Sequence, residues 1–345
     1  IAREVSLTTS KKSEKRSFYS QAENFSIQTL PKPDMTPSHY QERLDPKFIE
    51  YMTNENEHDY ELTRQSIIFH VIESQEMFLK LKEALDKYID QTSLKEIELS
   101  AVKDIVRETL KIDLEHQNSN LEKILKQKEQ GNLIYGIILQ EKSIYIGEIL
   151  NRLPEGEGYY FTKDKDFYKG TYSKGVFNGK GKFYEGGKGI LYEGGFINGA
   201  KEGFGIEKRE DGSVYSGNFI VGEKHGQGRY LWSTGEEYNG EFSHNKIEGM
   251  GTYRWADGTV YKGEWKNNEM NGKGLLIEPN GGRYLGDFKQ DKKDGYGVYT
   301  WADGWSYRGE WKDGLQEGTG VEINPNGEQK VGIWREGTVI SWLSN

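Results

Sequence analysis

The sequence predicts an α+β protein in which an extended arm and an α-helical hairpin precede an elongated, single-layer antiparallel β-meander. Three observations support this fold class. Glycine is absent from residues 1–130 and frequent from Gly131 onward. Tyrosines recur in the second part with a period of 23 residues. Before the boundary, apolar residues recur at spacings of three and four, which is the period of a helix face. Two architectures therefore meet near residue 131.

Composition excludes several protein classes. The chain has 345 residues, of which 34% are hydrophobic and 29% charged, as is ordinary for a soluble protein. No apolar run approaches the length of a spanning helix. The absence of cysteine excludes disulfides, Cys-ligated zinc, iron–sulfur clusters and a thiol nucleophile. With 43 glycines, 22 tyrosines and only 7 prolines, the chain is neither collagen-like nor a linker, so its glycines are expected at fixed positions in a repeat.

Residues 1–57 are predicted to form an extended, poorly structured arm. They contain Pro31, Pro33, Pro37 and Pro46 but few periodic apolar residues. The arm is either a solvated tail or a segment that lies along a larger partner. Since the first residue is Ile1 rather than methionine, a targeting peptide that precedes it stays an open alternative.

Residues 58–130 are predicted to form a helical hairpin. The first helix is expected from about His58 to Asp90, and a capping-box pattern at residues 93–96 predicts the start of the second. The first helix carries the apolar stripe Ile68, Val71, Ile72, Phe78, Leu81, Leu85 and Ile89, and the second carries Leu94, Ile97, Ala101, Ile105, Ile112, Leu121, Ile124 and Leu125. Helices of this length cannot bury both stripes against each other, so we expect the hairpin to provide a docking site of its own.

Residues 131–345 are predicted to form a repeat array. The repeats begin at Tyr145, Tyr168, Tyr192, Tyr215, Tyr238, Tyr261, Tyr284 and Tyr307, and a partial unit begins at Lys330. Each tyrosine is followed two residues later by glycine and, in all units but the first, four residues later by an aromatic residue. Gly-x-Gly begins eleven residues after each tyrosine. Eight units in register are not a coincidence of composition.

Each repeat is expected to be a β-hairpin. In residues 261–265, Tyr261, Gly263 and Trp265 alternate with charged residues and share one face of a strand. Asp257-Gly258 is expected to supply a two-residue turn into the next unit. The glycines of the Gly-x-Gly pairs, exemplified by Gly226, Gly228, Gly249, Gly251, Gly272 and Gly274, are expected to make room for neighbouring rings on the same face.

Tyr-x-Gly-x-(Trp/Phe) followed by Gly-x-Gly at this period resembles the MORN repeat (membrane occupation and recognition nexus), over residues 145 to about 337. The resemblance implies a single-layer β-sheet. MORN arrays occur in junctional membrane proteins, in plant phosphoinositide kinases, ahead of SET methyltransferase domains, and in cytoskeletal and axonemal proteins such as radial spoke heads. This chain most resembles the cytoskeletal and axonemal members.

The residues do not indicate catalysis. Gly-x-Gly recurs in predicted strands without a following Gly-Lys-Ser/Thr or helix, which argues against a phosphate-binding loop. The six histidines lack metal-ligand spacing, and Glu241, Glu264 and Glu310 share one repeat position that is expected to be a solvated face. We therefore expect no enzyme activity, no metal and no cofactor.

A single-layer sheet with one aromatic face lacks a second layer, which indicates a protein partner. We expect a structural adaptor that binds a helix or an extended segment along the groove of the array. All eight tryptophans follow Tyr215, and tryptophan is enriched at binding hot spots. The candidate contacts are Trp232, Trp255 and Trp301, then Trp265 and Trp311. The alternative for each is packing on its own sheet.

The resemblance places such an adaptor in the cytoplasm, in a cilium, an axoneme or the cytoskeleton. Two alternatives remain. One is peripheral binding to a membrane or a phosphoinositide, against which stands the net charge of −4 in residues 131–345 (27 Lys and Arg against 31 Asp and Glu). The other is an accessory subunit of another large assembly, including a mitochondrial one. No feature indicates nucleic-acid binding.

Overall fold

The computed structural model describes residues 68–114 and 133–343. The predicted arm, residues 1–57, lies outside this range. So do residues 58–67 of the predicted first helix and the part of the second that contains Leu121, Ile124 and Leu125.

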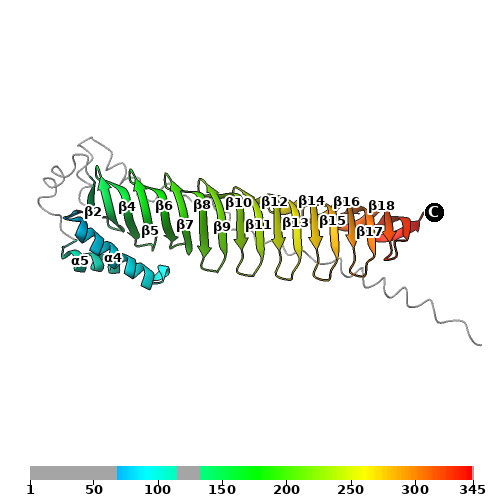
Figure 1. Cartoon of the computed structure of the whole chain (residues 1–345), viewed down its shortest axis with the longest axis horizontal. Coiled ribbons are helices and arrows are strands. Elements are labelled where there is room, and N and C mark those ends of the chain that lie inside the picture. The colour runs from blue at the N-terminus through cyan, green and yellow to red at the C-terminus, as the bar shows by residue number, and fades with distance from the viewer. Residues whose placement is uncertain (1–67, 115–132, 344–345) are drawn as a thin grey trace, which may run out of the picture. The chain divides into compact units, whose positions relative to one another are not determined.

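The described residues form a short strand, two α-helices and a long series of strands (Figure 1). Strand β1 (Ile68–Ile72) precedes helix α4 (Gln75–Gln91), the 3₁₀ turn η3 (Leu94–Glu96) and helix α5 (Leu99–Leu110). The strands that follow are β2 (Ile134–Leu139), β3 (Ser143–Leu150), β4 (Leu153–Thr162), β5 (Phe167–Ser173), β6 (Val176–Glu185), β7 (Ile190–Ile197), β8 (Ala200–Arg209), β9 (Val214–Ile220), β10 (Glu223–Leu231), β11 (Glu237–Ser243), β12 (Lys246–Arg254), β13 (Val260–Lys266), β14 (Glu269–Ile277), β15 (Arg283–Lys289), β16 (Lys292–Thr300), β17 (Ser306–Lys312), β18 (Leu315–Ile323), β19 (Gln329–Arg335) and β20 (Thr338–Trp342).

The twenty described strands belong to one antiparallel sheet. From β2 to β20 each strand pairs with its neighbour in the sequence, and β1 returns to pair with β2. Paired glycines mark the register of the repeats, as where Gly251 faces Gly263 and Gly274 faces Gly286. The predicted meander without an internal helix is confirmed, as is the α+β class.

The first helix is shorter than predicted. Residues 68–72, expected on its apolar stripe, form β1, in which Ile72 lies opposite Tyr135 of β2. Helix α4 begins only at Gln75, after Ser74 has capped it by accepting a hydrogen bond from the amide of Met77. The run Ile67–Ile72 is rich in β-branched residues, which fit a buried strand, and its apolar spacing alone cannot separate strand from helix.

The predicted capping box is also wrong. The hydroxyl of Ser93 makes no capping hydrogen bond, and residues 94–96 form a single 3₁₀ turn. Helix α5 starts at Leu99 and ends at Leu110, and the next residue, Lys111, caps it in a left-handed conformation (φ 57°). The second helix therefore has 12 residues in one piece, and the expected long arm is absent from the described part.

The two helices cover one face of the first strands of the sheet (Figure 1). Their buried stripes are Phe78, Leu81, Leu85 and Ile89 on α4, and Leu99, Val102, Val106 and Leu110 on α5. These residues pack in one cluster with Ile137, Leu139, Ile144, Ile146, Tyr159, Phe161, Phe167 and Tyr184 of the sheet. The described part of the hairpin stripes is therefore buried within the chain, which removes the argument that these residues need an outside partner. Leu121, Ile124 and Leu125 lie outside the described residues, so the independent docking site stays a prediction.

The tight turns are not where the sequence analysis placed them. Asp257-Gly258 belongs to a five-residue loop between β12 and β13, closed by the amide of Trp255 donating to the carbonyl of Thr259. The two-residue turns lie inside the repeats instead, as at Asn267-Asn268, where φ is 51° and 69°. Asparagine tolerates this left-handed conformation, which two-residue hairpins require.

Candidate protein-binding faces of the repeat sheet

Successive residues of a strand point to opposite faces, so the sheet has two distinct faces. We call the face that carries the repeat tyrosines the tyrosine face, and the other the second face. The eight tyrosines are at most 2% exposed. Because no other described element lies over them as a layer, this burial comes from the sheet itself.

Each repeat tyrosine lies flat on its own sheet and closes a hydrogen bond within its repeat. The hydroxyl of Tyr238 donates to the carbonyl of Glu241 at 3.1 Å, and that of Tyr261 to the carbonyl of Glu264 at 2.9 Å. All eight repeat tyrosines make this contact three residues along the chain. In most repeats the strand register shifts at this point. The tyrosine therefore satisfies a carbonyl that the irregularity releases from the ladder.

The two glycines of each Gly-x-Gly have different roles, which the sequence analysis did not separate. A Cβ on Gly251, the second glycine, would lie 2.5 Å from the Tyr238 ring. Gly249, the first, has φ 64° and lies beside the carboxylate of Glu241 instead. The second glycine thus gives the ring its place, and the first supplies the left-handed conformation that the strand needs there.

A carboxylate that lies three residues after the repeat tyrosine, as in Glu241, Glu264 and Asp287, also has a structural role. Glu264 accepts the amide of Lys273 at 3.0 Å, and Asp287 accepts the amide of Tyr296 at 3.0 Å. Glu241 binds the equivalent amide of Met250 at 3.2 Å. The sequence analysis expected only a solvated face at Glu241, Glu264 and Glu310, and missed that the left-handed glycine turns an amide toward this carboxylate.

Burial makes the repeat tyrosines unsuited to proton transfer near neutral pH. Desolvation raises the pKa of Tyr168, Tyr215, Tyr261 and Tyr284 far above the usual tyrosine value. Their hydroxyls are also engaged as donors to backbone carbonyls. The tyrosine ladder therefore supports the sheet.

The five candidate tryptophans fall into two groups. Trp232, Trp265 and Trp311 are 7%, 3% and 5% exposed. Trp265 and Trp311 pack on the repeat tyrosines Tyr261 and Tyr307, and Trp232 packs on Tyr230 and Tyr253. Trp255 and Trp301 are half-buried. Trp255 lies 4.5 Å from the Tyr253 ring and Trp301 4.9 Å from the Tyr299 ring, between ring centroids. Within the tyrosine face, these two offer indole surface to a partner.

The repeat between them places Glu278 at the position of these two tryptophans. One of its oxygens accepts the hydroxyl of Tyr299 at 2.6 Å, and the other lies 3.8 Å from the ammonium of Lys293. This ammonium in turn lies 4.3 Å from the centroid of the Tyr299 ring. The charge of Glu278 is thus balanced locally, between the two half-buried indoles of Trp255 and Trp301.

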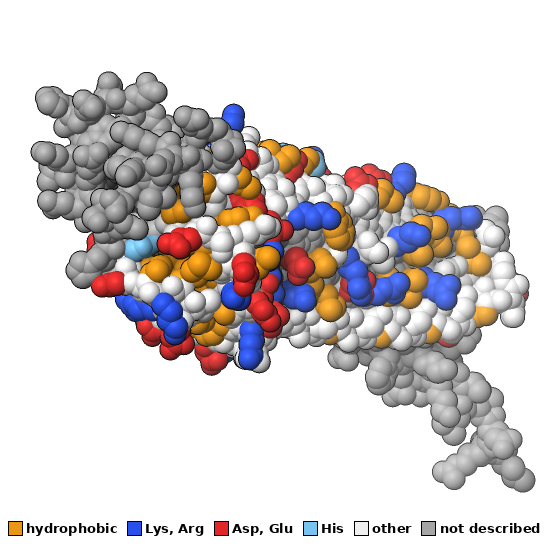
Figure 2. Space-filling view, turned by 60° about the vertical axis from the view of Figure 1, so that its left-hand side comes forward, with side chains coloured by type: hydrophobic (Ala, Val, Ile, Leu, Met, Phe, Trp, Pro, Cys, Tyr) orange, Lys and Arg blue, Asp and Glu red, His pale blue; other side chains and the backbone are white. Residues whose placement is uncertain are grey.

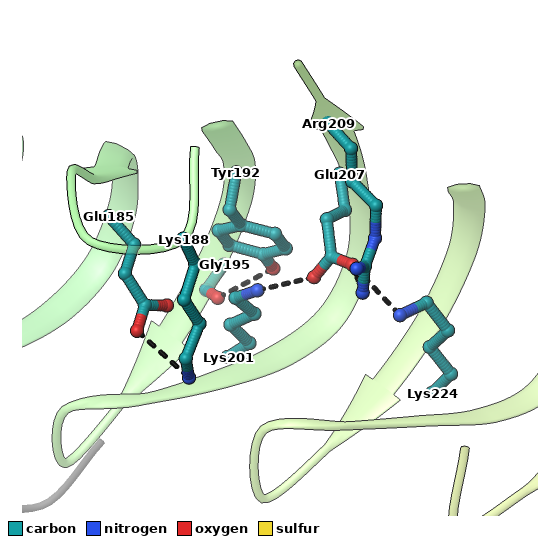
Figure 3. Close-up of polar contacts among 8 residues, drawn as sticks. All are labelled: Glu185, Lys188, Tyr192, Gly195, Lys201, Glu207, Arg209 and Lys224. Carbon is teal, nitrogen blue, oxygen red and sulfur yellow. Dashed lines mark hydrogen bonds and ion pairs between the residues drawn. The ribbon is translucent and has the colours of Figure 1, made fainter. Parts of the chain in front are cut away.

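A buried charge cluster interrupts the aromatic pattern of the tyrosine face (Figure 3). Glu207 bridges Lys201 at 2.5 Å and Lys224 at 2.8 Å, and the three residues are 5%, 1% and 3% exposed. Lys201 also lies 4.8 Å from the centroid of the Tyr192 ring. Other repeats have Tyr230 or Tyr253 at the position of Glu207, so the aligned sequence held a signal that the sequence analysis did not use.

Electrostatics keep this cluster charged. Burial opposes the ionisation of Glu207, but the charges of Lys201 and Lys224 outweigh it and hold its pKa below the usual range. Burial lowers the pKa of both lysines, although the carboxylate opposes this shift. A carboxylate between two lysines and against aromatic rings is a structural ion cluster.

No group of three or more His, Asp or Glu side chains in residues 68–114 and 133–343 could hold a metal ion. No helix in the same ranges is long and apolar enough to cross a membrane.

The repeats match a known family model. The MORN repeat model matches residues 168–188, 192–214, 215–237, 238–260, 261–283, 284–306 and 307–329. This part of the chain therefore consists of seven MORN repeats. The unit from Tyr145 lies outside the matched residues, although its tyrosine makes the same hydrogen bond as the others. Among curated proteins, none matches the chain.

Solved structures resemble the chain only distantly. The TCP domain of Drosophila melanogaster SAS-4, in complex with a proline-rich motif of Ana2, has a TM-score of 0.30 and 13% identity, and the match covers 45% of this chain and 84% of that one. The TCP10 domain of Danio rerio CPAP has a TM-score of 0.30 and 9% identity, over 61% of this chain and 96% of that one.

Proposed function

We propose that this MORN-repeat chain is a non-catalytic adaptor that binds a segment of a partner protein on the tyrosine face, around Trp255 and Trp301. The observation that carries this proposal is the partial exposure of these two indoles, each resting on a buried tyrosine. Packed aromatic anchors with one free edge are typical of binding hot spots.

The spacing of the two indoles indicates the size of the partner segment. They follow β12 and β16, which are four strands apart, or about 19 Å at the usual strand separation. An extended segment of about six residues covers this distance, with apolar side chains at its two ends. The buried Trp232, Trp265 and Trp311 then support the site from below.

The assembly that contains the partner is a further part of the proposal. We propose an axonemal, ciliary or otherwise cytoskeletal assembly, on the ground of the family resemblance alone. Imaging of the tagged chain in ciliated cells tests this part separately, and a uniformly membrane-bound or mitochondrial signal would contradict it.

The binding proposal is tested with the double variant Trp255→Ala/Trp301→Ala. Interacting proteins are cross-linked to the full chain in cells and quantified by mass spectrometry. We expect the double variant to lose a defined subset of partners at least about tenfold, with circular dichroism unchanged.

The matched control is Trp305→Ala/Trp342→Ala, which removes two indoles that are 39% and 38% exposed and lie outside this pair. This control should keep the subset. Equal loss in both variants, or no loss in the first, would contradict the proposed site.

A further inference from the structure

The second face of β13–β18 carries a row of six residues, four apolar and two cationic, in which Leu285 and both cations are exposed and the other apolar residues are half-buried. Six residues lie opposite one another across six strands, and we call them the cross-strand row: Lys262, Leu275, Leu285, Val298, Arg308 and Val321. Leu285 is 62% exposed, and Tyr296 beside the row is 56% exposed. Figure 2 shows such a mixture of apolar (orange) and basic (blue) side chains, with few acidic ones (red), on the right-hand part of the visible surface.

This surface carries two exposed cations, Lys262 and Arg308, although the chain as a whole is acidic. Neither Lys262 nor Arg308 has an ion-pair partner among the described residues, and both are exposed. The nearby carboxylates of Glu264 and Asp287 are instead bound to backbone amides, and Asp287 also pairs with Lys273. The cations of the row therefore remain available to an acidic ligand.

An intramolecular contact at the start of the sheet shows that the second face can bind a helix. At the start of the sheet, helix α4 lies on the second face, where Asp86 pairs with Lys169 at 2.8 Å and accepts the hydroxyl of Tyr159 at 2.6 Å. Lys169 occupies the repeat position of Lys262 and Arg308, directly after the repeat tyrosine. Tyr159 occupies the position of the apolar Leu275, Val298 and Val321. The cross-strand row thus has residues at the same repeat positions as those that bind α4, but no described helix covers it.

From this correspondence we propose that the cross-strand row binds an acidic amphipathic helix of a partner protein, laid across the strands as α4 is. This site lies on the opposite face from Trp255 and Trp301, so it is independent of the proposed function and would give the adaptor a second partner site.

The geometry of α4 sets the spacing of the ligand. From Phe78, which stacks on Tyr135 of β2, to Asp86, which binds Lys169 of β5, the helix crosses three strands in eight residues. Lys262 and Arg308 are four strands apart, or about 19 Å, which is about 13 helical residues. The carboxylates that share one helix face at this distance are 11 or 14 residues apart, with apolar residues between them.

A lipid surface is the less suitable ligand. The carboxylates of Glu264 and Asp287 lie on the same face between the cations, and anionic headgroups would meet them. A helix can present an acidic residue to each cation alone and an apolar residue to Leu285.

The test selects ligands from a library of 18-residue helical peptides with a fixed apolar stripe and randomised flanks, using the full chain as bait. We expect enriched peptides to carry Asp or Glu 11 or 14 residues apart. Fluorescence anisotropy should then show at least a tenfold affinity loss in Lys262→Glu/Arg308→Glu. Lysine at the two acidic positions of the peptide should restore binding to this variant.

The matched control is Lys142→Glu/Lys163→Glu, which changes the net charge equally in exposed loops at the other end of the sequence. It should bind the selected peptides normally. The proposal is overturned if the selected peptides show no acidic residues at the expected spacing, or if the charge swap does not restore binding. It is also overturned if Lys262→Glu/Arg308→Glu weakens binding to vesicles of phosphatidylserine and phosphatidylcholine but not to the peptides. The Trp255→Ala/Trp301→Ala variant should leave peptide affinity unchanged.

Discussion

A tyrosine ring over two glycines is the smallest unit of this fold. The ring of Tyr238 occupies the volume that a side chain on Gly251 would need, and its hydroxyl holds the carbonyl of Glu241. The same contact in each repeat explains why glycine is abundant here while proline is rare. A residue usually associated with flexibility thus creates a close-packed site.

Replacing Gly251 with alanine should destabilise the protein by about 1–3 kcal/mol, because the methyl group would overpack against the Tyr238 ring. Urea unfolding followed by tryptophan fluorescence measures the change. The control is Gly187→Ala, where an added Cβ meets no atom within 4 Å. If both variants unfold at the same urea concentration, the result would contradict the idea that the tyrosine ring packed on Gly251 stabilises the sheet.

Replacing Glu207 with glutamine should destabilise the protein by about 3–5 kcal/mol, because it leaves Lys201 and Lys224 buried without their anion. Replacing all three with residues that other repeats have there, Lys201→Phe, Glu207→Tyr and Lys224→Ile, should be neutral or stabilising. Thermal unfolding of the two variants checks this contrast. A mild effect of Glu207→Gln would show that the cluster is hydrated.

The same cluster predicts a pH dependence. The pKa of Glu207 is lower in the folded chain than the ordinary glutamate value of 4.5, so the unfolded chain binds the proton more readily. Its contribution to stability is therefore full above about pH 4.5 and is lost as the pH falls below it. Between pH 7 and pH 3, the wild-type protein should lose more stability than the triple apolar variant. Parallel losses in urea unfolding would contradict this assignment.

At the scale of elements, helix α4 depends on the sheet beneath it. Leu85 is fully buried between the helix and the first strands, whereas Leu79 on the same helix is 52% exposed. Leu85→Ala should cost about 2–5 kcal/mol through the cavity it leaves, and Leu79→Ala should cost little. Hydrogen exchange of the α4 amides measures both. Equal protection of the α4 amides from hydrogen exchange in the two variants would mean that α4 does not depend on its packing against the sheet.

At the scale of the whole molecule, each repeat contacts its neighbours in sequence, so stability should be nearly additive along the array. Deleting residues 238–260, which are one full repeat, joins Glu237 to Tyr261 and preserves the alternation of faces. We expect this variant to fold, with a modestly lower melting temperature and the same strand-dominated circular dichroism.

Deleting residues 239–260 instead shifts every later residue by one position relative to the strand before it. This slip exchanges the two faces at the junction and would expose tyrosines to solvent. We expect aggregation or a broad, early thermal transition. If both deletions behave alike, the 23-residue register does not determine the fold.

The repeat array could be predicted because its period repeats the same physical constraint eight times. One strand with alternating faces is weak evidence, but a tyrosine, a glycine and an aromatic residue in register across eight units leave one arrangement. Residues 68–72 could not be assigned from their spacing, since a short apolar run suits a helix or a buried strand equally. Pairing with β2 decided between them.

Of the candidate site residues, the sequence identified the tryptophans but not their exposure. Trp255 and Trp265 look equivalent in composition, yet the first is half-buried and the second is covered by the Tyr238 and Tyr261 rings. The cross-strand row was invisible as well, because its successive members are 10 or 13 residues apart in the sequence and meet only through strand pairing.

The sequence by itself determined the repeat, the register of glycines and tyrosines, and the division of the chain near residue 131, because local alternation and period express these directly. Only the tertiary structure decided that the helices cover the second face of the first strands, and that the same face at β13–β18 keeps its cations and Leu285 exposed. The physical reason is that burial depends on which segments meet in space, and that contact is made by residues far apart in the chain.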